Sequence, residues 1–176
     1  MGRIGKVIGI GCGTILAIAV LVFGIALCRV LLPKSPVTDC SKYPKIRASW
    51  PSHLVAHFPA SLPPSAVFYF HPNYIQSGSS IQARVPMSQE EGVSLLTKYS
   101  SNALAIYQVY QGCVLATNGI PTTVFYTSGT TDREFPDDYC VLVLSAETHY
   151  QWANGQSAGI AVSTQRHEVV YWAESW

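Results

Sequence analysis

The stretch Cys140-Val141-Leu142-Val143-Leu144 is apolar at every position. A short, continuous apolar run is typical of a strand that is covered on both faces, so we expect this one at the centre of a sheet. Other runs rich in β-branched and aromatic residues predict further strands around it. With the central run, the predicted strands occupy residues 105–110, 122–127, 139–144, 158–163 and 169–173. The carboxyl-terminal half of the chain is therefore built mainly of β-structure.

A hairpin and a helix precede these strands. The aromatic run of residues 66–70 and the alternating stretch of residues 81–87 flank a turn at Gly78, which predicts a β-hairpin. Ser88-Gln89-Glu90-Glu91 has the form of a capping box and predicts a helix over about residues 89–101. The apolar residues at helical spacing after it are Val93, Leu96 and Tyr99. The predicted fold class is α+β, a mostly antiparallel sheet with one main helix packed on it.

The amino-terminal segment has the length of a membrane span. Residues 7–28 contain no charged side chain and no proline, and as a helix they would span about 33 Å, which matches a bilayer core. A cleaved signal peptide has a shorter apolar core and small residues at its exit, whereas bulky Leu27 stands here before Cys28. We therefore expect a single retained transmembrane helix rather than a cleaved or lipidated leader.

The chain divides into three parts by composition. Residues 1–34 form the expected cytoplasmic stub and transmembrane helix, and the proline-containing residues 35–50 are expected to be an extended tether. The folded domain is expected over residues 51–176. Residues 1–34 carry four basic and no acidic residues, whereas the remainder has a net charge of −3. With only 12% charged and 48% apolar residues overall, the chain is neither a disordered protein nor a nucleic-acid binder.

Small residues recur at every fourth position along the amino-terminal segment, from residue 5 to residue 17. They are Gly5, Gly9, Gly13 and Ala17. Such a stripe lets a second helix approach closely, so we expect this helix to pack against itself or against another membrane protein, with the bilayer as the other partner. Glycine is also simply common in membrane helices, which is the competing explanation.

The motifs of catalysis are incomplete. Gly155-Gln156-Ser157-Ala158-Gly159 matches the nucleophile-elbow pattern, but a strand follows it where the elbow needs a helix. His53 and His57 are four residues apart, yet Leu54 stands where a metalloprotease would have its glutamate. We expect no catalytic residue and no cofactor.

An acidic loop is the one weak candidate for a metal site. Its carboxylates are Asp132, Glu134, Asp137 and Asp138. Calcium favours oxygen-rich loops, but the spacing is not that of an EF-hand and Arg133 can neutralise part of the charge. A solvated turn is the alternative interpretation.

Three cysteines follow the apolar segment: Cys40, Cys113 and Cys140. Three thiols allow one disulfide, and Cys113 with Cys140 is the first choice because both fall among the predicted strands. Three buried thiols acting as small apolar side chains are the alternative.

Three stretches of the chain resemble a family of uncharacterised bacterial proteins that are membrane-anchored or exported. They are residues 58–72, residues 126–139 and the ending GIAVSTQRHEVVYWAESW at residues 159–176. The resemblance implies no known activity. It does imply a bacterial envelope location. The cysteines after residue 34 and the absence of charge runs there suit an exported domain, so we expect a single-pass protein of the bacterial inner membrane with its amino terminus in the cytoplasm and its carboxyl-terminal domain in the periplasm.

Two functions remain open at this level. The first is a non-catalytic, single-pass protein whose exported domain binds or braces a partner, as an accessory subunit of a respiratory or photosynthetic type of membrane complex. The alternative is an exported domain that binds a small molecule or peptide, or is a weak enzyme, in an aromatic-lined cleft with His71, His149 or the acidic loop at its rim.

Overall fold

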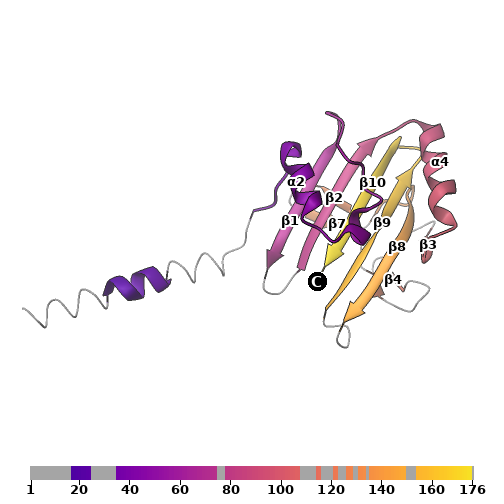
Figure 1. The fold of residues 1–176 in the computed structure, drawn as a ribbon. Coiled ribbons are helices and arrows are strands. Elements are labelled where there is room, and N and C mark those ends of the chain that lie inside the picture. The colour runs from indigo at the N-terminus through magenta and orange to yellow at the C-terminus, as the bar shows by residue number, and fades with distance from the viewer. Residues whose placement is uncertain are drawn as a thin grey trace, which may run out of the picture. The chain divides into compact units, whose positions relative to one another are not determined.

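Six strands form one antiparallel sheet in the order β1-β2-β10-β9-β8-β3 (Figure 1). The computed structural model describes residues 17–24, 35–74, 78–107, 114–115, 121–122, 126–128, 131–133, 135–149 and 154–175. The chain divides into two compact units, Met1–Lys34 and Ser35–Trp176, and the sheet belongs to the second. The sheet strands are β1 (Val67–Tyr74), β2 (Gly78–Pro86), β3 (Ala105–Tyr107), β8 (Cys140–His149), β9 (Asn154–Ser163) and β10 (Glu168–Ser175). Two small ladders pair β4 (Val114–Leu115) with β5 (Pro121–Thr122) and β6 (Tyr126–Ser128) with β7 (Thr131–Arg133).

Four helical elements are described in the second unit. They are η1 (Cys40–Lys42), α2 (Tyr43–Ala48), α3 (Ser52–Val55) and α4 (Gln89–Ser100). The α+β class, the hairpin of β1 and β2 and the helix expected over residues 89–101 are confirmed. The expectation of one main helix holds for α4 by length, but η1, α2 and α3 also cover the sheet.

The apolar run of residues 140–144 opens strand β8. Val141, Leu142 and Val143 are completely buried, and β8 pairs with β9 on one edge and β3 on the other. The strand is thus interior and covered on both faces, as expected, although it is second from the edge of the sheet rather than in the middle.

A bulge in β8 lies opposite Gly159 of β9. The register of the two strands shifts between Val143 and Ser145. A Cβ atom on Gly159 would lie 2.1 Å from the carbonyl oxygen of Leu142 and 2.6 Å from Cζ2 of Trp172. Only glycine fits between this backbone and the indole ring, so Gly159 lets the Trp172 ring approach β9 closely.

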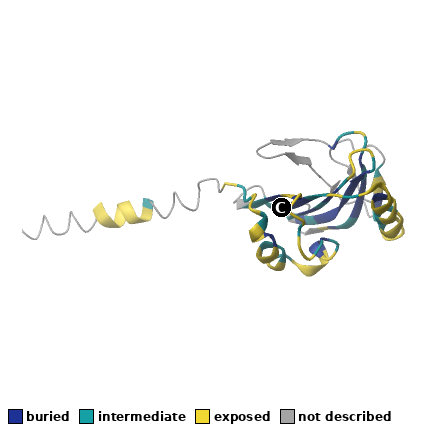
Figure 2. Cartoon of the chain, turned by 90° about the horizontal axis from the view of Figure 1, so that it is seen from above, coloured by how far each residue is buried: buried dark blue, intermediate teal, exposed yellow. Residues whose placement is uncertain are grey.

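The helices cover one face of the sheet, seen edge-on in Figure 2. Over β1 and β2, Tyr43, Leu54 and Phe58 pack on Phe68 and Ile81. Over β8 and β9, side chains of α4 pack on Leu142, Ile160 and Val162, and Tyr171 joins the two clusters. The opposite face has its own core. Its buried members include Phe135, Tyr139, Val141, Val143, Val170 and Trp172.

The stretch expected to be a tether, residues 35–50, is part of the folded unit. Val37 and Phe70 exchange two backbone hydrogen bonds, of 2.8 and 2.9 Å, which add a bridge to the edge of β1. Tyr43 is fully buried, and its hydroxyl donates to the carbonyl oxygen of Pro59 over 2.6 Å. The expectation of an extended tether was wrong because this side chain fills the space over β1 and β2.

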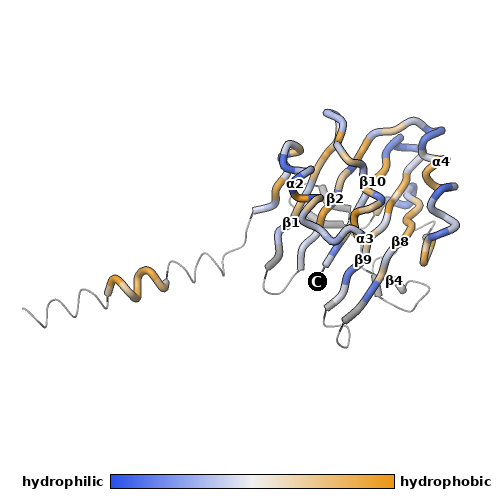
Figure 3. Tube along the Cα trace, in the orientation of Figure 1, coloured by the Kyte–Doolittle hydropathy of each residue, from blue (hydrophilic) through white to orange (hydrophobic). Residues whose placement is uncertain are grey.

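Residues 17–24 form a helical segment with exposed apolar side chains (Figures 2 and 3). Ile18, Val20, Leu21, Val22 and Phe23 all expose 60% or more of their surface. No helix in the described part of the chain is long and apolar enough to cross a membrane. Gly5, Gly9 and Gly13 of the small-residue stripe lie outside the described residues, and Ala17 is exposed.

Candidate functional site

A pocket in the described part of the second unit lies between α4, the end of β2 and the start of β10. We call it the α4 pocket, and its volume is about 320 Å³. Its lining residues are Val85, Pro86, Met87, Glu91, Ser94, Leu95, Val169 and Tyr171. Five of these are apolar, and Glu91, Ser94 and Tyr171 add a carboxylate and two hydroxyl groups. A mostly apolar wall with a few polar groups is typical of small-ligand sites, and this volume is at the lower end of their range.

Local sequence fixes where the pocket begins. The hydroxyl of Ser88 accepts the Glu91 N–H over 3.2 Å, and the Glu91 carboxylate accepts the Ser88 N–H over 2.7 Å. This capping box starts α4 two residues after Met87. The Met87 N–H donates to the carbonyl oxygen of His167 over 2.8 Å and so ties the end of β2 to the turn before β10. The positive φ of 55° at His167 belongs to that turn.

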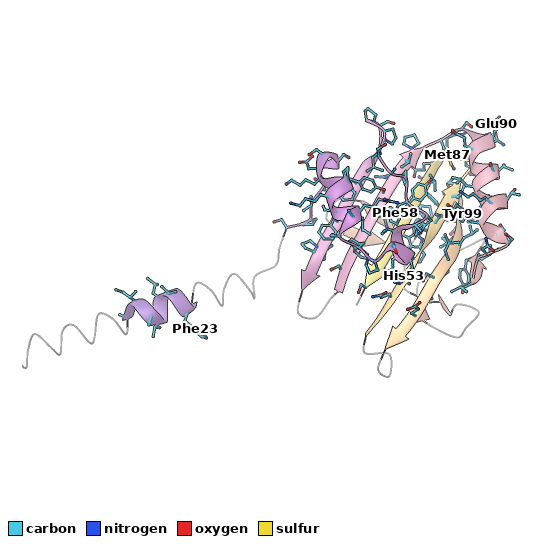
Figure 4. All side chains as sticks on the ribbon, in the orientation of Figure 1. Phe23, His53, Phe58, Met87, Glu90 and Tyr99 are labelled. Carbon is cyan, nitrogen blue, oxygen red and sulfur yellow. The ribbon has the colours of Figure 1, made fainter. Side chains whose placement is uncertain are left out.

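Gly92 lets α4 lie close to Met87, one of the residues that line the pocket. A Cβ atom at this buried position would lie 2.8 Å from Cε of Met87 and 3.4 Å from Cγ2 of Thr164. Glycine is a poor helix former, so its position inside α4 is explained by this close approach. Figure 4 shows Met87 and Tyr99 beside the sheet-facing side of α4 and Glu90 at the start of the helix.

The charge of the pocket wall is negative. Glu91 is the only carboxylate among the described residues that line it, and these include no lysine, arginine or histidine. Burial raises the pKa of Tyr171, and the charges of Tyr99 and Glu91 raise it further. The phenol therefore stays protonated and can donate or accept a hydrogen bond.

Tyr171 also contacts two aromatic residues that follow α3. Its ring centroid lies 6.3 Å from that of His57 and 5.8 Å from that of Phe58. Nε2 of His57 lies 2.9 Å from the carbonyl oxygen of Gly159, which makes the ring a neutral donor to the sheet. Burial lowers the pKa of His57 to about 4, although hydrogen bonds to the backbone of Gly159 and Trp172 oppose this shift. His57 thus fastens the segment after α3 to β9.

His53 and His57 both lie within hydrogen-bond distance of β9. Nε2 of His53 lies 3.2 Å from Oε1 of Gln156, and His57 bonds to the backbone of Gly159. Nη2 of Arg47 donates to the carbonyl oxygens of Val55 and Phe58, each over 3.2 Å, and caps the end of α3. No group of three metal-binding side chains occurs among the residues that the structure describes.

In the described part of the acidic loop, Asp138 forms an ion pair with Arg166. Asp138 accepts two hydrogen bonds from Arg166, of 2.7 and 3.0 Å, and one from the Ser163 hydroxyl over 2.6 Å. These bonds hold the pKa of Asp138 below its usual value. Asp137 is exposed, Asp132 lies in β7, and Glu134 lies outside the described residues. Asp138 therefore clamps the start of β8 to the β9–β10 turn, supported by a hydrogen bond from Tyr139 to Glu168.

On the sheet face opposite the helices, one row of paired residues crosses four strands and includes polar groups. Tyr69, Gln82, Trp172 and Gly159 lie side by side across β1, β2, β10 and β9. Nε1 of Trp172 and the hydroxyl of Ser157 are buried without a hydrogen-bond partner among the described residues. Ser157 lies inside β9 and not at a turn into a helix, so the geometry of a nucleophile elbow is absent at this position.

The structure gives no support to the expected disulfide between Cys113 and Cys140. Cys40 and Cys140 are free thiols, and Cys113 lies outside the described residues. The Cys40 thiol donates to the carbonyl oxygen of Ala66 over 3.6 Å, and burial raises the pKa of the Cys140 thiol. A raised pKa keeps a thiol protonated and unreactive.

Sequence reasoning found the start of α4 but not the pocket beside it. Of the apolar residues expected to face the core, Leu96 and Tyr99 do so, but Val93 is 52% exposed. Gly92 and Leu95 take that face instead. The sequence feature that indicates this buried face of α4 is Gly92, a glycine inside a helix of otherwise favourable residues. His71 in β1 and His149 in β8, expected at the rim of a cleft, are not among the lining residues of the α4 pocket.

Comparison of the chain with protein-family models, curated proteins and solved structures gives no significant match.

Proposed function

We propose that this chain is a membrane-anchored binding protein whose α+β domain holds a small, largely apolar ligand in the α4 pocket. The observation that carries the proposal is the pocket itself, about 320 Å³ between α4 and the sheet, with a mostly apolar wall and three polar groups. Pockets of this composition bind ligands by burying their apolar surface and orient them through a few hydrogen bonds.

The polar groups of the pocket suit binding rather than a reaction. Covalent and acid–base catalysis need a nucleophile and a base within hydrogen-bond reach. Here no nucleophile with a base beside it occurs among the described lining residues, and burial keeps Tyr171 protonated. Glu91 and Tyr171 can orient a ligand through hydrogen bonds.

The anchor part of the proposal concerns the first unit. Residues 7–28 form an uninterrupted apolar segment, and the described part of it, residues 17–24, is helical and exposes five large apolar side chains. Such a surface is stable when lipid covers it. On this proposal the amino terminus is cytoplasmic, the domain is periplasmic at a bacterial inner membrane, and the glycine stripe packs against a second helix.

The pocket has a built-in reporter. The chain has two methionines, Met1 and Met87, and Met87 lines the pocket, whereas Met1 lies outside the described residues. We propose to label the methionine methyl groups of the full chain with ¹³C, place it in phosphatidylcholine nanodiscs and add n-hexanol. Binding in the pocket is expected to shift the Met87 signal with saturation and to leave the Met1 signal in place.

Two variants make this experiment specific. Gly92→Ala pushes the Met87 methyl group toward the pocket and should weaken binding of n-hexanol, whereas Val93→Ala, on the exposed face of α4, should not. A Met87 signal that no probe moves, or equal effects of the two variants, would refute a binding function for this pocket.

A further inference from the structure

We propose that the α4 pocket selects ligands that combine an apolar chain with a positively charged ammonium group, bound beside Glu91. The inference rests on the binding function proposed above and adds the chemical class of the ligand. Three observations carry it: the sign of the charge on the wall, the acceptor atoms that remain available, and the position of an aromatic ring.

The carboxylate of Glu91 retains an acceptor for a ligand. Its Oε2 atom takes the Ser88 N–H over 2.7 Å. Its Oε1 atom accepts no hydrogen bond from any residue in the described part of the chain, and no basic side chain of that part lines the pocket to neutralise it. A cationic ligand therefore supplies the countercharge that the pocket wall itself does not.

Tyr171 and Ser94 add to the same preference. Within the described residues, neither hydroxyl group makes a hydrogen bond, so both oxygens are available as acceptors at the wall. An ammonium group has three N–H donors and no acceptor, which suits a site of one carboxylate and two hydroxyl oxygens. The ring of Tyr171 attracts a cation further when the cation lies over its face.

The helix dipole acts in the opposite direction but is outweighed. The amino terminus of a helix carries about half a positive charge, which favours anions. Glu90 and Glu91 both lie in the first turn of α4 and carry a full negative charge each, and Ser88 already occupies the N–H of Glu91. Lys98 is seven residues further along α4, about 10 Å away along the axis. The field at the pocket is therefore negative.

The test compares three probes of one chain length. The labelled full chain in phosphatidylcholine nanodiscs is titrated at pH 7 and low salt with n-hexylammonium, n-hexanol and n-hexanoate, and the Met87 signal gives each Kd. We expect n-hexylammonium to bind roughly fivefold more tightly than n-hexanol and n-hexanoate to bind more weakly than both, because a partly exposed charge contact contributes about 1 kcal/mol.

Two charge variants assign the preference to one residue. Glu91→Gln should abolish the advantage of n-hexylammonium while α4 keeps its start, because glutamine also completes a capping box. Glu90→Gln removes the same charge one residue earlier, outside the lining of the pocket, and should retain most of the advantage. Comparing variants at equal lipid and probe concentrations removes the effect of probe partition into the bilayer.

The outcomes separate the two proposals. Equal binding of the three probes, tighter binding of n-hexanoate, or an equal loss in both charge variants would overturn the ammonium preference and leave a binding pocket. A Met87 signal that none of the three probes moves would overturn the binding function together with the preference.

Discussion

The ring of Tyr171 lies against the imidazole of His57, with centroids 6.3 Å apart and an angle of 38° between the planes. The same tyrosine lines the α4 pocket. Tyr171 of β10 therefore contacts both the α4 pocket and His57, the buried histidine that bonds to Gly159 of β9. The stability of α3 and the shape of the pocket therefore depend on the same part of the sheet.

The His57 contact predicts a loss of stability in mild acid. The pKa of His57 is about 4 in the folded chain, whereas the ordinary pKa of an exposed histidine is 6.5. His57 therefore binds a proton more readily in the unfolded chain than in the folded one. The contribution of neutral His57 to the free energy of unfolding is complete above pH 6.5 and is lost as the pH falls toward 4. The expected loss is up to about 3 kcal/mol, measured by denaturant unfolding between pH 7.5 and 4.5.

One variant tests whether His57 causes that pH dependence. His57→Gln can still donate to Gly159 but does not titrate, so its stability should be nearly constant over the same pH range. The carboxyl groups with lowered pKa values, Asp39, Glu90 and Asp138, act mainly near and below pH 4. A variant with the same slope as the natural chain between pH 6.5 and 4.5 would show that another group is responsible.

Gly92→Ala should separate stability from binding. Alanine is the better helix former by about 1 kcal/mol, and the atom it meets is the mobile end of Met87. We expect a thermal midpoint that is unchanged or slightly higher, together with a smaller pocket. A large drop in the midpoint in calorimetry would instead show that Met87 cannot move aside.

Val143→Asp should unfold the domain. Val143 is completely buried between β9 and β3, so the substitution places an unpaired charge in the core at a cost of several kcal/mol. Ile106→Asp on β3 is the matched control, because Ile106 is 44% exposed and should lose little. Circular dichroism of both variants measures the difference. A folded Val143→Asp protein would mean that β8 is not an interior strand.

Ser157→Ala should be neutral or slightly stabilising. The hydroxyl of Ser157 is buried without a hydrogen-bond partner in the described part of the chain, so its removal relieves a desolvation cost on the order of 1 kcal/mol. Denaturant unfolding of the variant measures the change. A loss of more than about 1 kcal/mol would show that a bound water or another group satisfies this hydroxyl in solution.

Local sequence determined the elements whose signals lie within a few residues. The capping box of Ser88 and Glu91 starts α4 where expected because its two hydrogen bonds join residues three apart. Gly78, with a φ of 69°, stands where β2 begins and pairs with Tyr74, the last residue of β1. This signal is local too, because glycine adopts a positive φ readily. The apolar run of residues 140–144 predicted a covered strand because no exposed position would tolerate five consecutive apolar side chains.

Tertiary structure alone decided what surrounds those elements. The α4 pocket exists because Val85 of β2 pairs with Val169 of β10, more than eighty residues later, and no local pattern encodes that register. Which side of α4 faces the sheet was set by the close approach at Gly92, which turns Val93 outward although its spacing is helical. Tyr43 is buried because distant strands leave space for it, so a stretch that reads as a tether became core. The sequence by itself determined the β1–β2 hairpin, α4 and the covered strand β8, whose signals are local. The helices of residues 40–48 and the α4 pocket arose from contacts between segments far apart in the chain, whose energies depend on packing rather than on local preference.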